Sequence, residues 1–126
     1  MVLDAGCGLD CSSTAELYIA DELGVAPSDV MYTSNYTSPT DLERAYKQGV
    51  IINLDDVTLV KSLKDTVGGF PGLISFRFNP GLGNTDSETA SNVLGGPSAK
   101  FGVPDDQIEE AYRQAKEGAM KCPRSG

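Results

Sequence analysis

The stretch that decides the fold is Gly49-Val50-Ile51-Ile52-Asn53-Leu54-Asp55, where a glycine is followed by a continuous apolar run. Glycine often ends a helix, because it adopts left-handed backbone angles without steric cost. A short run rich in β-branched residues is typical of a strand, and continuous apolar character is typical of a strand buried on both faces. Residues 50–54 are therefore predicted to form an internal strand of a parallel sheet, and Asp55 is predicted to cap the helix that follows.

The same order of elements recurs on both sides of this stretch. Ser13 and Glu16 form a capping box that opens one helix, and Ser38 before Pro39 opens another. Strands are predicted at residues 8–11, 30–33, 50–54 and 73–78; helices lie between Ser13 and Gly24, Ser38 and Gly49, Asp55 and Gly68, and from Pro104 to about Met120. A long loop from Asn79 to about Val103 separates the last strand from the last helix. This alternation predicts an α/β fold with parallel strands and crossover helices.

Four strand–helix units are half the number in an eight-stranded barrel. Residues 1–126 are therefore expected to form one domain, either a partial (β/α) barrel or a small open sheet. Such a sheet would have two unpaired edge strands and one apolar face without helices. Unpaired edges and exposed apolar surface favour pairing with another chain, so a homo-oligomer is expected.

Composition excludes several classes of function. Ten basic and eighteen acidic residues give a net charge of −8, which disfavours a nucleic-acid partner. No apolar run is long enough to span a membrane, and no secretion signal opens the chain. The three cysteines, Cys7, Cys11 and Cys122, are an odd number and indicate reduced thiols in a cytoplasmic protein. With no histidine and no second pair of ligands, no metal site is expected.

A glycine-containing stretch near the start of the chain has two interpretations. Residues 2–8, Val-Leu-Asp-Ala-Gly-Cys-Gly, resemble the first motif of methyltransferases that use S-adenosylmethionine. That family usually has a third glycine where this chain has Asp10, and an acidic residue at the end of the next strand. Here the next strand ends in Thr33-Ser34-Asn35, without a carboxylate. A small methyltransferase-like domain is therefore the alternative interpretation.

The second resemblance covers most of the chain. It is carried by Gly6-Cys7-Gly8-Leu9-Asp10-Cys11-Ser12-Ser13, by residues 24–30, by residues 49–55, by Phe76-Arg77-Phe78-Asn79-Pro80-Gly81 and by Ser98-Ala99-Lys100-Phe101-Gly102-Val103-Pro104. In this order and spacing they resemble the pyridoxal-phosphate-dependent barrel decarboxylases, which include the diaminopimelate, ornithine and carboxynorspermidine decarboxylases. The Asn79-Pro80-Gly81 triplet and the long loop after it look more like the diaminopimelate branch. The resemblance implies a lyase of lysine biosynthesis, with pyridoxal 5′-phosphate as cofactor and an amino acid as substrate.

The resemblance also implies roles for three residues. Asp10 would lie near the lysine that carries the cofactor, Arg77 would point into the cofactor pocket near the phenolic oxygen of the ring, and Lys100 would lie near the subunit interface. Ordinary structural roles are the alternatives. Asp10 would bond the amides of the next helix, Arg77 would form an ion pair inside the barrel, with Asp10 as one candidate partner, and Lys100 would be a surface lysine.

Several parts of the family pattern are not found in residues 1–126. The resemblance covers the second to fifth barrel units; the first strand with its cofactor-binding lysine, the later strands and the C-terminal β-domain lie outside it. The chain is therefore expected to be part of a larger decarboxylase, to contain no catalytic residue of its own and to be inactive in isolation. A non-catalytic α/β module that acts only by association is a further alternative.

Overall fold

The fold is known from a computed structural model, which describes residues 3–35, 37–71, 73–80 and 102–120. Short 3-10 helices lie at Leu3–Ala5 and Pro27–Asp29. The strands are β1 (Leu9–Cys11), β2 (Val30–Ser34), β3 (Ile51–Leu54), β4 (Ile74–Phe76), β5 (Phe78–Asn79) and β6 (Val103–Pro104), and the helices are α1 (Thr14–Glu22), α2 (Pro39–Gln48), α3 (Thr58–Val67) and α4 (Asp105–Met120). Within these ranges the α/β class and the order of strands and helices are confirmed.

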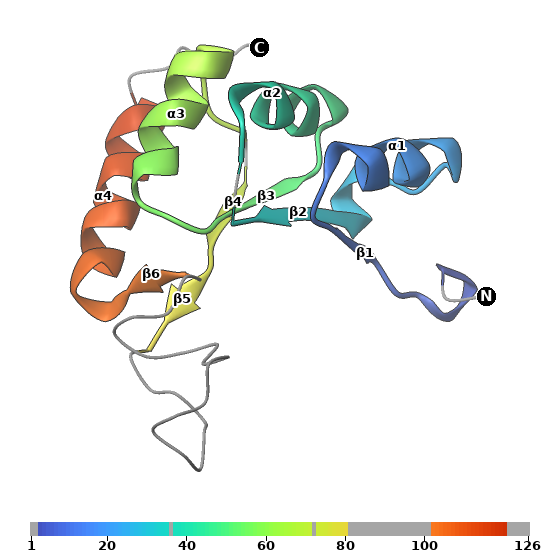
Figure 1. The fold of residues 1–126 in the computed structure, drawn as a ribbon, viewed down its shortest axis with the longest axis horizontal. Coiled ribbons are helices and arrows are strands. Elements are labelled where there is room, and N and C mark those ends of the chain that lie inside the picture. Colours follow the sequence, from blue (N-terminus) through green and yellow to red (C-terminus); the bar gives the residue numbers. More distant parts are fainter. Residues whose placement is uncertain (1–2, 36, 72, 81–101, 121–126) are drawn as a thin grey trace.

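The main sheet has four parallel strands in the order β1-β2-β3-β4. Its strands follow one another in space as they do in sequence, as in a barrel rather than a doubly wound sheet. The helices all lie on one side of the curved sheet, with α1 and α2 over its first strands and α3 and α4 beside β4 (Figure 1). The opposite, concave side has no helix among the described residues, and we call it the uncovered face.

Local hydrogen bonds explain where the helices begin and end. At α2 the Ser38 hydroxyl accepts from the Asp41 N–H at 3.2 Å, and the Asp41 carboxylate accepts from the Ser38 N–H at 3.1 Å. The helix ends at Gly49, whose φ of 77° is left-handed, as its sequence position predicts. At α1 the pattern differs slightly from the expected capping box, because Glu16 accepts from the N–H of Ser12.

The predicted cap of α3 is wrong. Asp56 rather than Asp55 accepts a hydrogen bond from a backbone N–H at the start of α3, because its carboxylate lies 2.7 Å from the Thr58 nitrogen. Asp55 is instead 5% exposed and directed to another partner. The physical reason is position: Asp55 directly follows the last buried residue of β3 and still has the alternation of the strand, whereas Asp56 has left it.

The predicted strand at residues 73–78 is two short strands, β4 and β5, with Arg77 between them. The chain changes partners at this point. The Arg77 N–H still donates to the Leu54 carbonyl of β3 at 2.9 Å, but the Arg77 carbonyl accepts from the Val103 N–H at 2.6 Å. The predicted loop therefore begins and ends in a second, two-stranded sheet, formed by β5 and β6. The interior of that loop lies outside the described residues.

The core lies between the main sheet and its helices. Alternate strand residues such as Tyr32, Ile52 and Leu54 are at most 1% exposed and pack against the helices. The other members of the buried apolar cluster are Cys11, Leu17, Ala20, Val30, Leu42, Ala45, Val50, Val60, Leu63, Phe76, Val103, Ala111 and Ala115. Within the described residues, none of the helices combines the length and apolar character needed to cross a bilayer.

Candidate functional site

The uncovered face is built from the strand residues that alternate with the core. Thr33, Asn53 and Ser75 lie in register on three neighbouring strands and form a polar row across this face. The Asn53 side-chain N–H donates to the Thr33 hydroxyl at 3.2 Å, while the buried Asn53 Oδ1 has no hydrogen-bond partner among the described residues. The expectation of an apolar face therefore holds only in part: Met31 and Ile51 lie on this face, whereas the row two residues further along the strands is short and polar.

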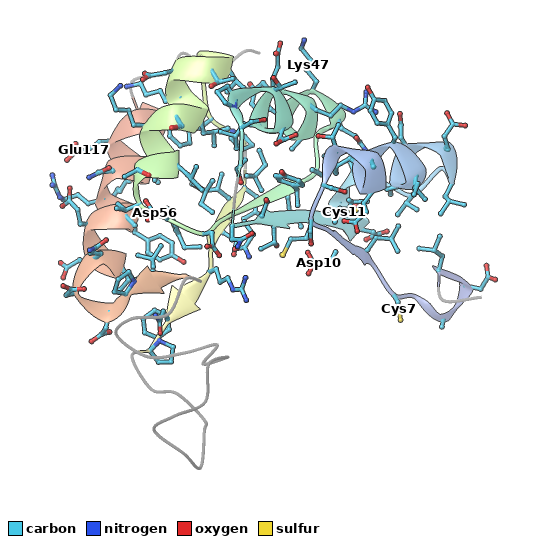
Figure 2. The ribbon with its side chains drawn as sticks, in the orientation of Figure 1. Cys7, Asp10, Cys11, Lys47, Asp56 and Glu117 are labelled. Atoms are coloured by element: carbon cyan, nitrogen blue, oxygen red, sulfur yellow. The ribbon has the colours of Figure 1, made fainter. Side chains whose placement is uncertain are left out.

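Asp10 lies in β1 and its side chain is exposed. Cys11, the next residue along the strand, is buried in the core. Figure 2 shows Asp10 on the side of the sheet away from α1 and α2. The alternative role for Asp10, bonding the first amides of α1, is filled by other groups: the Ser13 hydroxyl serves the N–H of Glu16, and Glu16 serves that of Ser12.

Arg77 follows β4, on the same face as Ser75 by strand alternation. Its Nη1 lies 3.5 Å from Oδ1 of Asp55; the Arg77 side chain is 41% exposed and that of Asp55 is 5% exposed. Asp10 is not the partner of this ion pair, because β2 and β3 lie between the strands that carry the two residues. The internal ion pair expected as an alternative is present, but its acid is Asp55.

Sequence reasoning missed Asn53, Asp55 and Ser75 as members of this face. The signal is present as a period of two: polar residues occur at positions 53 and 55, at the end of one strand, and at 75 and 77, at the end of the next. The strand at residues 50–54 was interpreted as buried on both faces because of its apolar run, and that interpretation hid the alternation. Lys100, the third candidate residue, lies outside the described residues.

The cysteines do not form a site in this part of the chain. Cys11 is buried, and burial, followed by the negative charge of Glu16, raises the pKa of its thiol. Cys7 is exposed, precedes β1, and lies well away from Cys11 in Figure 2. Both are free thiols, and the described residues contain no group of three metal-binding side chains.

The glycine stretch before β1 has a structural explanation. A Cβ atom at Gly8 would lie 2.5 Å from the carbonyl oxygen of Asp29, so the glycine lets two backbones approach each other. In the methyltransferase interpretation this space would be needed by a cofactor. The strand that should end in a ribose-binding carboxylate, β2, ends at Ser34. Neither observation supports that alternative.

The donors on the uncovered face fit one side of pyridoxal phosphate. Arg77 is the only cation that the described strands and their ends place on this face, and its half-open guanidinium suits an anionic oxygen. The buried Asn53 Oδ1, on the strand residue paired with Ser75, has no donor among the described residues. Covalent attachment of the cofactor needs a lysine, and the described residues place none on this face. The described lysines Lys47, Lys61, Lys64 and Lys116 all lie on helices.

Comparisons with known proteins agree with this geometry. Residues 1–121 match the family model of the pyridoxal-dependent decarboxylase pyridoxal binding domain. Protein TabA of Pseudomonas amygdali pv. tabaci is 33% identical over 91% of the chain, and diaminopimelate decarboxylase of Thermoplasma acidophilum is 34% identical over 90%. The solved structure of Helicobacter pylori diaminopimelate decarboxylase with L-lysine superposes with a TM-score of 0.80 over 94% of the chain, at 24% identity, which concerns the fold alone.

The chain spans about a quarter of the length of these curated relatives, 26% of TabA and 27% of the Thermoplasma enzyme, and 30% of the Helicobacter chain. The match is nevertheless continuous over nearly all of the sequence and includes every strand of the main sheet. The same fold is shared with a viral arginine decarboxylase, of Paramecium bursaria Chlorella virus, at a TM-score of 0.68. By these matches the chain belongs to the pyridoxal-dependent decarboxylase family, whose pyridoxal binding domain residues 1–121 match.

Proposed function

We propose that this chain lines the cofactor pocket of a pyridoxal-phosphate-dependent decarboxylase whose substrate is diaminopimelate. The observation that carries the proposal is the position of Arg77: a partly exposed guanidinium at the carboxyl end of β4, on the uncovered face. In (β/α) barrels the carboxyl ends of the strands carry the chemistry. When bound there, pyridoxal phosphate supplies a ring that accepts the electron pair left by departing carbon dioxide.

Asp10 and Arg77 would act from different strands of the same pocket. Asp10 is in register with Met31 and Ile51, whereas Arg77 is level with Asp55, four residues further along β3. Strands of an eight-stranded barrel tilt by roughly 36°, which staggers neighbours by about one residue. Between β1 and β4 there are three such steps, so the stagger accounts for about three of the four residues by which Arg77 lies further along its strand than Asp10. This supports placing both side chains at one level of the barrel.

The two side chains have complementary tasks in this proposal. The Arg77 guanidinium donates hydrogen bonds to an anionic oxygen of the cofactor and orients its ring. The Asp10 carboxylate pairs with a protonated amine and keeps it in position near the ring. Both tasks are binding and orientation, so residues 1–126 contribute to the pocket without containing the lysine that holds the cofactor.

The choice of substrate is supported by the relatives rather than by the geometry. Several curated relatives are named diaminopimelate decarboxylase, at 34% identity in Thermoplasma acidophilum and 35% in Methanothermobacter thermautotrophicus. Among the described residues β1 and β4 are the edge strands of the main sheet, and unpaired edges favour pairing with another chain, which supports a homo-oligomer. A cytoplasmic location and a subunit-interface role for Lys100 remain predictions from the sequence.

A chimera tests the proposed function directly. The matching 114 residues of the Thermoplasma enzyme are replaced by the corresponding part of this chain, and release of carbon dioxide is measured with diaminopimelate, ornithine and lysine. We expect activity on diaminopimelate alone, with Arg77→Gln and Asp10→Asn versions at least tenfold less active. A folded chimera that binds no pyridoxal phosphate, or prefers ornithine, would contradict the proposal.

A further inference from the structure

The backbone of Arg77 is held from two sides. Its N–H donates to the Leu54 carbonyl at 2.9 Å and its carbonyl accepts from the Val103 N–H at 2.6 Å. Gly102 makes the second contact possible, because a Cβ at this glycine would lie 3.1 Å from the Arg77 carbonyl oxygen and its φ is +88°. These bonds fix where the Arg77 side chain begins, but they do not determine where its guanidinium points.

Asp55 is a group that can restrict this direction. Its carboxylate is 5% exposed and lies 3.5 Å from Nη1 of Arg77. A buried carboxylate is costly without a cation, and the attraction between the two charges falls slowly with distance. Asp56, the next residue, is exposed and bonds Thr58 at the start of α3. The two adjacent acids thus have separate tasks, and only Asp55 faces the guanidinium.

We propose that Asp55 is a positioning residue, which holds the guanidinium of Arg77 in one orientation over the uncovered face. A guanidinium has five N–H donors, and the contact with Asp55 involves one of its terminal nitrogens. This contact restricts the orientation of the whole planar group, and 41% of the Arg77 side chain is exposed on the uncovered face. The ligand in question rests on the proposed function, whereas the ion pair does not.

The experiment uses the 126-residue chain and two readouts. Asp55→Asn removes the charge while keeping the shape, and Asp55→Glu restores the charge. Asp21→Asn is the matched control, because Asp21 pairs with Arg44 at 3.3 Å on the outer surface. The first readout is the nitrogen-15 NMR spectrum of the Arg77 guanidinium, assigned from Arg77→Gln. The second is the affinity for pyridoxine 5′-phosphate, which has no aldehyde and so binds without a covalent bond.

We expect separate guanidinium resonances for Arg77 in the unmodified chain, which collapse to an averaged signal in Asp55→Asn and reappear, at least in part, in Asp55→Glu. Arg77→Gln should weaken pyridoxine phosphate binding by about tenfold. In the chain that keeps Arg77, Asp55→Asn should weaken pyridoxine phosphate binding several-fold. In the Arg77→Gln variant, the same change should weaken it less than twofold. Asp21→Asn should leave both readouts unchanged.

The two readouts separate the possible failures. The positioning role is overturned if the guanidinium signals are already averaged in the unmodified chain, a result that does not depend on whether Asp55→Asn folds. It is also overturned if Asp55→Asn leaves these signals unchanged. Equal losses of affinity from Asp55→Asn with and without Arg77 would overturn it as well. An ordered guanidinium that Asp55 controls, in a chain without affinity for pyridoxine phosphate, would leave the positioning role standing and contradict the cofactor role of Arg77.

Discussion

Replacing Gly8 with alanine is expected to lower the free energy of unfolding by about 1–3 kcal/mol. The added Cβ would lie 2.5 Å from the carbonyl oxygen of Asp29, whereas ordinary contacts begin at 3.4 Å. A shift of about 0.9 Å is therefore needed. The obstacle is backbone and cannot rotate away, because the turn at Asp29 is tied by its N–H to Ala26 at 2.8 Å. The shift falls immediately before the pairing of Leu9 with Val30.

The assay is urea unfolding followed by far-ultraviolet circular dichroism, with the slope compared between variants. Gly6→Ala is the contrasting control: it has open space around it but a φ of +80°, so its cost is backbone strain of about 1–2 kcal/mol. Asparagine should recover part of this stability at Gly6, since it tolerates left-handed angles, but none at Gly8. Gly8→Ala within about 0.3 kcal/mol of the unmodified chain would refute the close approach of the two backbones.

Three further outcomes follow from the structure. The pKa of Asp41 is lowered first by its hydrogen bond from Thr14 and then by those from Ser38. The stability that this carboxylate contributes is therefore present above its unfolded pKa, near 3.9, and is lost as the pH falls through its lower pKa in the folded protein. Asp41→Asn should cost about 1 kcal/mol at pH 7 and flatten the acid limb of a stability–pH curve. In a Cys122→Ser background, a thiol reagent should label Cys7 rapidly and Cys11 only on unfolding, and equal rates would contradict the burial of Cys11. Sedimentation velocity at micromolar concentration should show a species heavier than 13.3 kDa, and a monomer that unfolds cooperatively would contradict the predicted association.

The boundaries of α2 were predictable from the sequence because they depend on neighbouring residues, whereas the start of α3 was not. Ser38, Pro39 and Asp41 contain in four positions everything that starts α2, and Gly49 alone supplies the backbone angles that end it. Parallel strands were predictable from the order of elements, since parallel neighbours need a crossover connection, most often a helix, and each gap between the predicted strands of the main sheet contains one. The break at Arg77 was not predictable, because it depends on Val103, which is distant in sequence and whose N–H binds the Arg77 carbonyl.

The candidate site was predictable to a different extent. Resemblance to a family identified Asp10 and Arg77, which the structure places on the same face of the sheet but on strands separated by two others. The local sequence did not identify Asp55 as the partner of Arg77. Two adjacent aspartates before a helix are equivalent as caps, and only the register of β3 against β4 shows which of them faces the arginine.

The polar row on the uncovered face, Thr33, Asn53 and Ser75, differs from both a solvent surface and a dry core. A solvent-exposed sheet face carries mostly long charged side chains, and a sheet face that packs into a core carries mostly aliphatic ones. Thr33, Asn53 and Ser75 are neither, since they are short, polar and only partly exposed. The unpartnered Asn53 Oδ1 would be costly if nothing were to supply a donor. A ligand at the carboxyl ends of the strands, as proposed above, would supply such a donor, and Arg77 lies at that end of the same face.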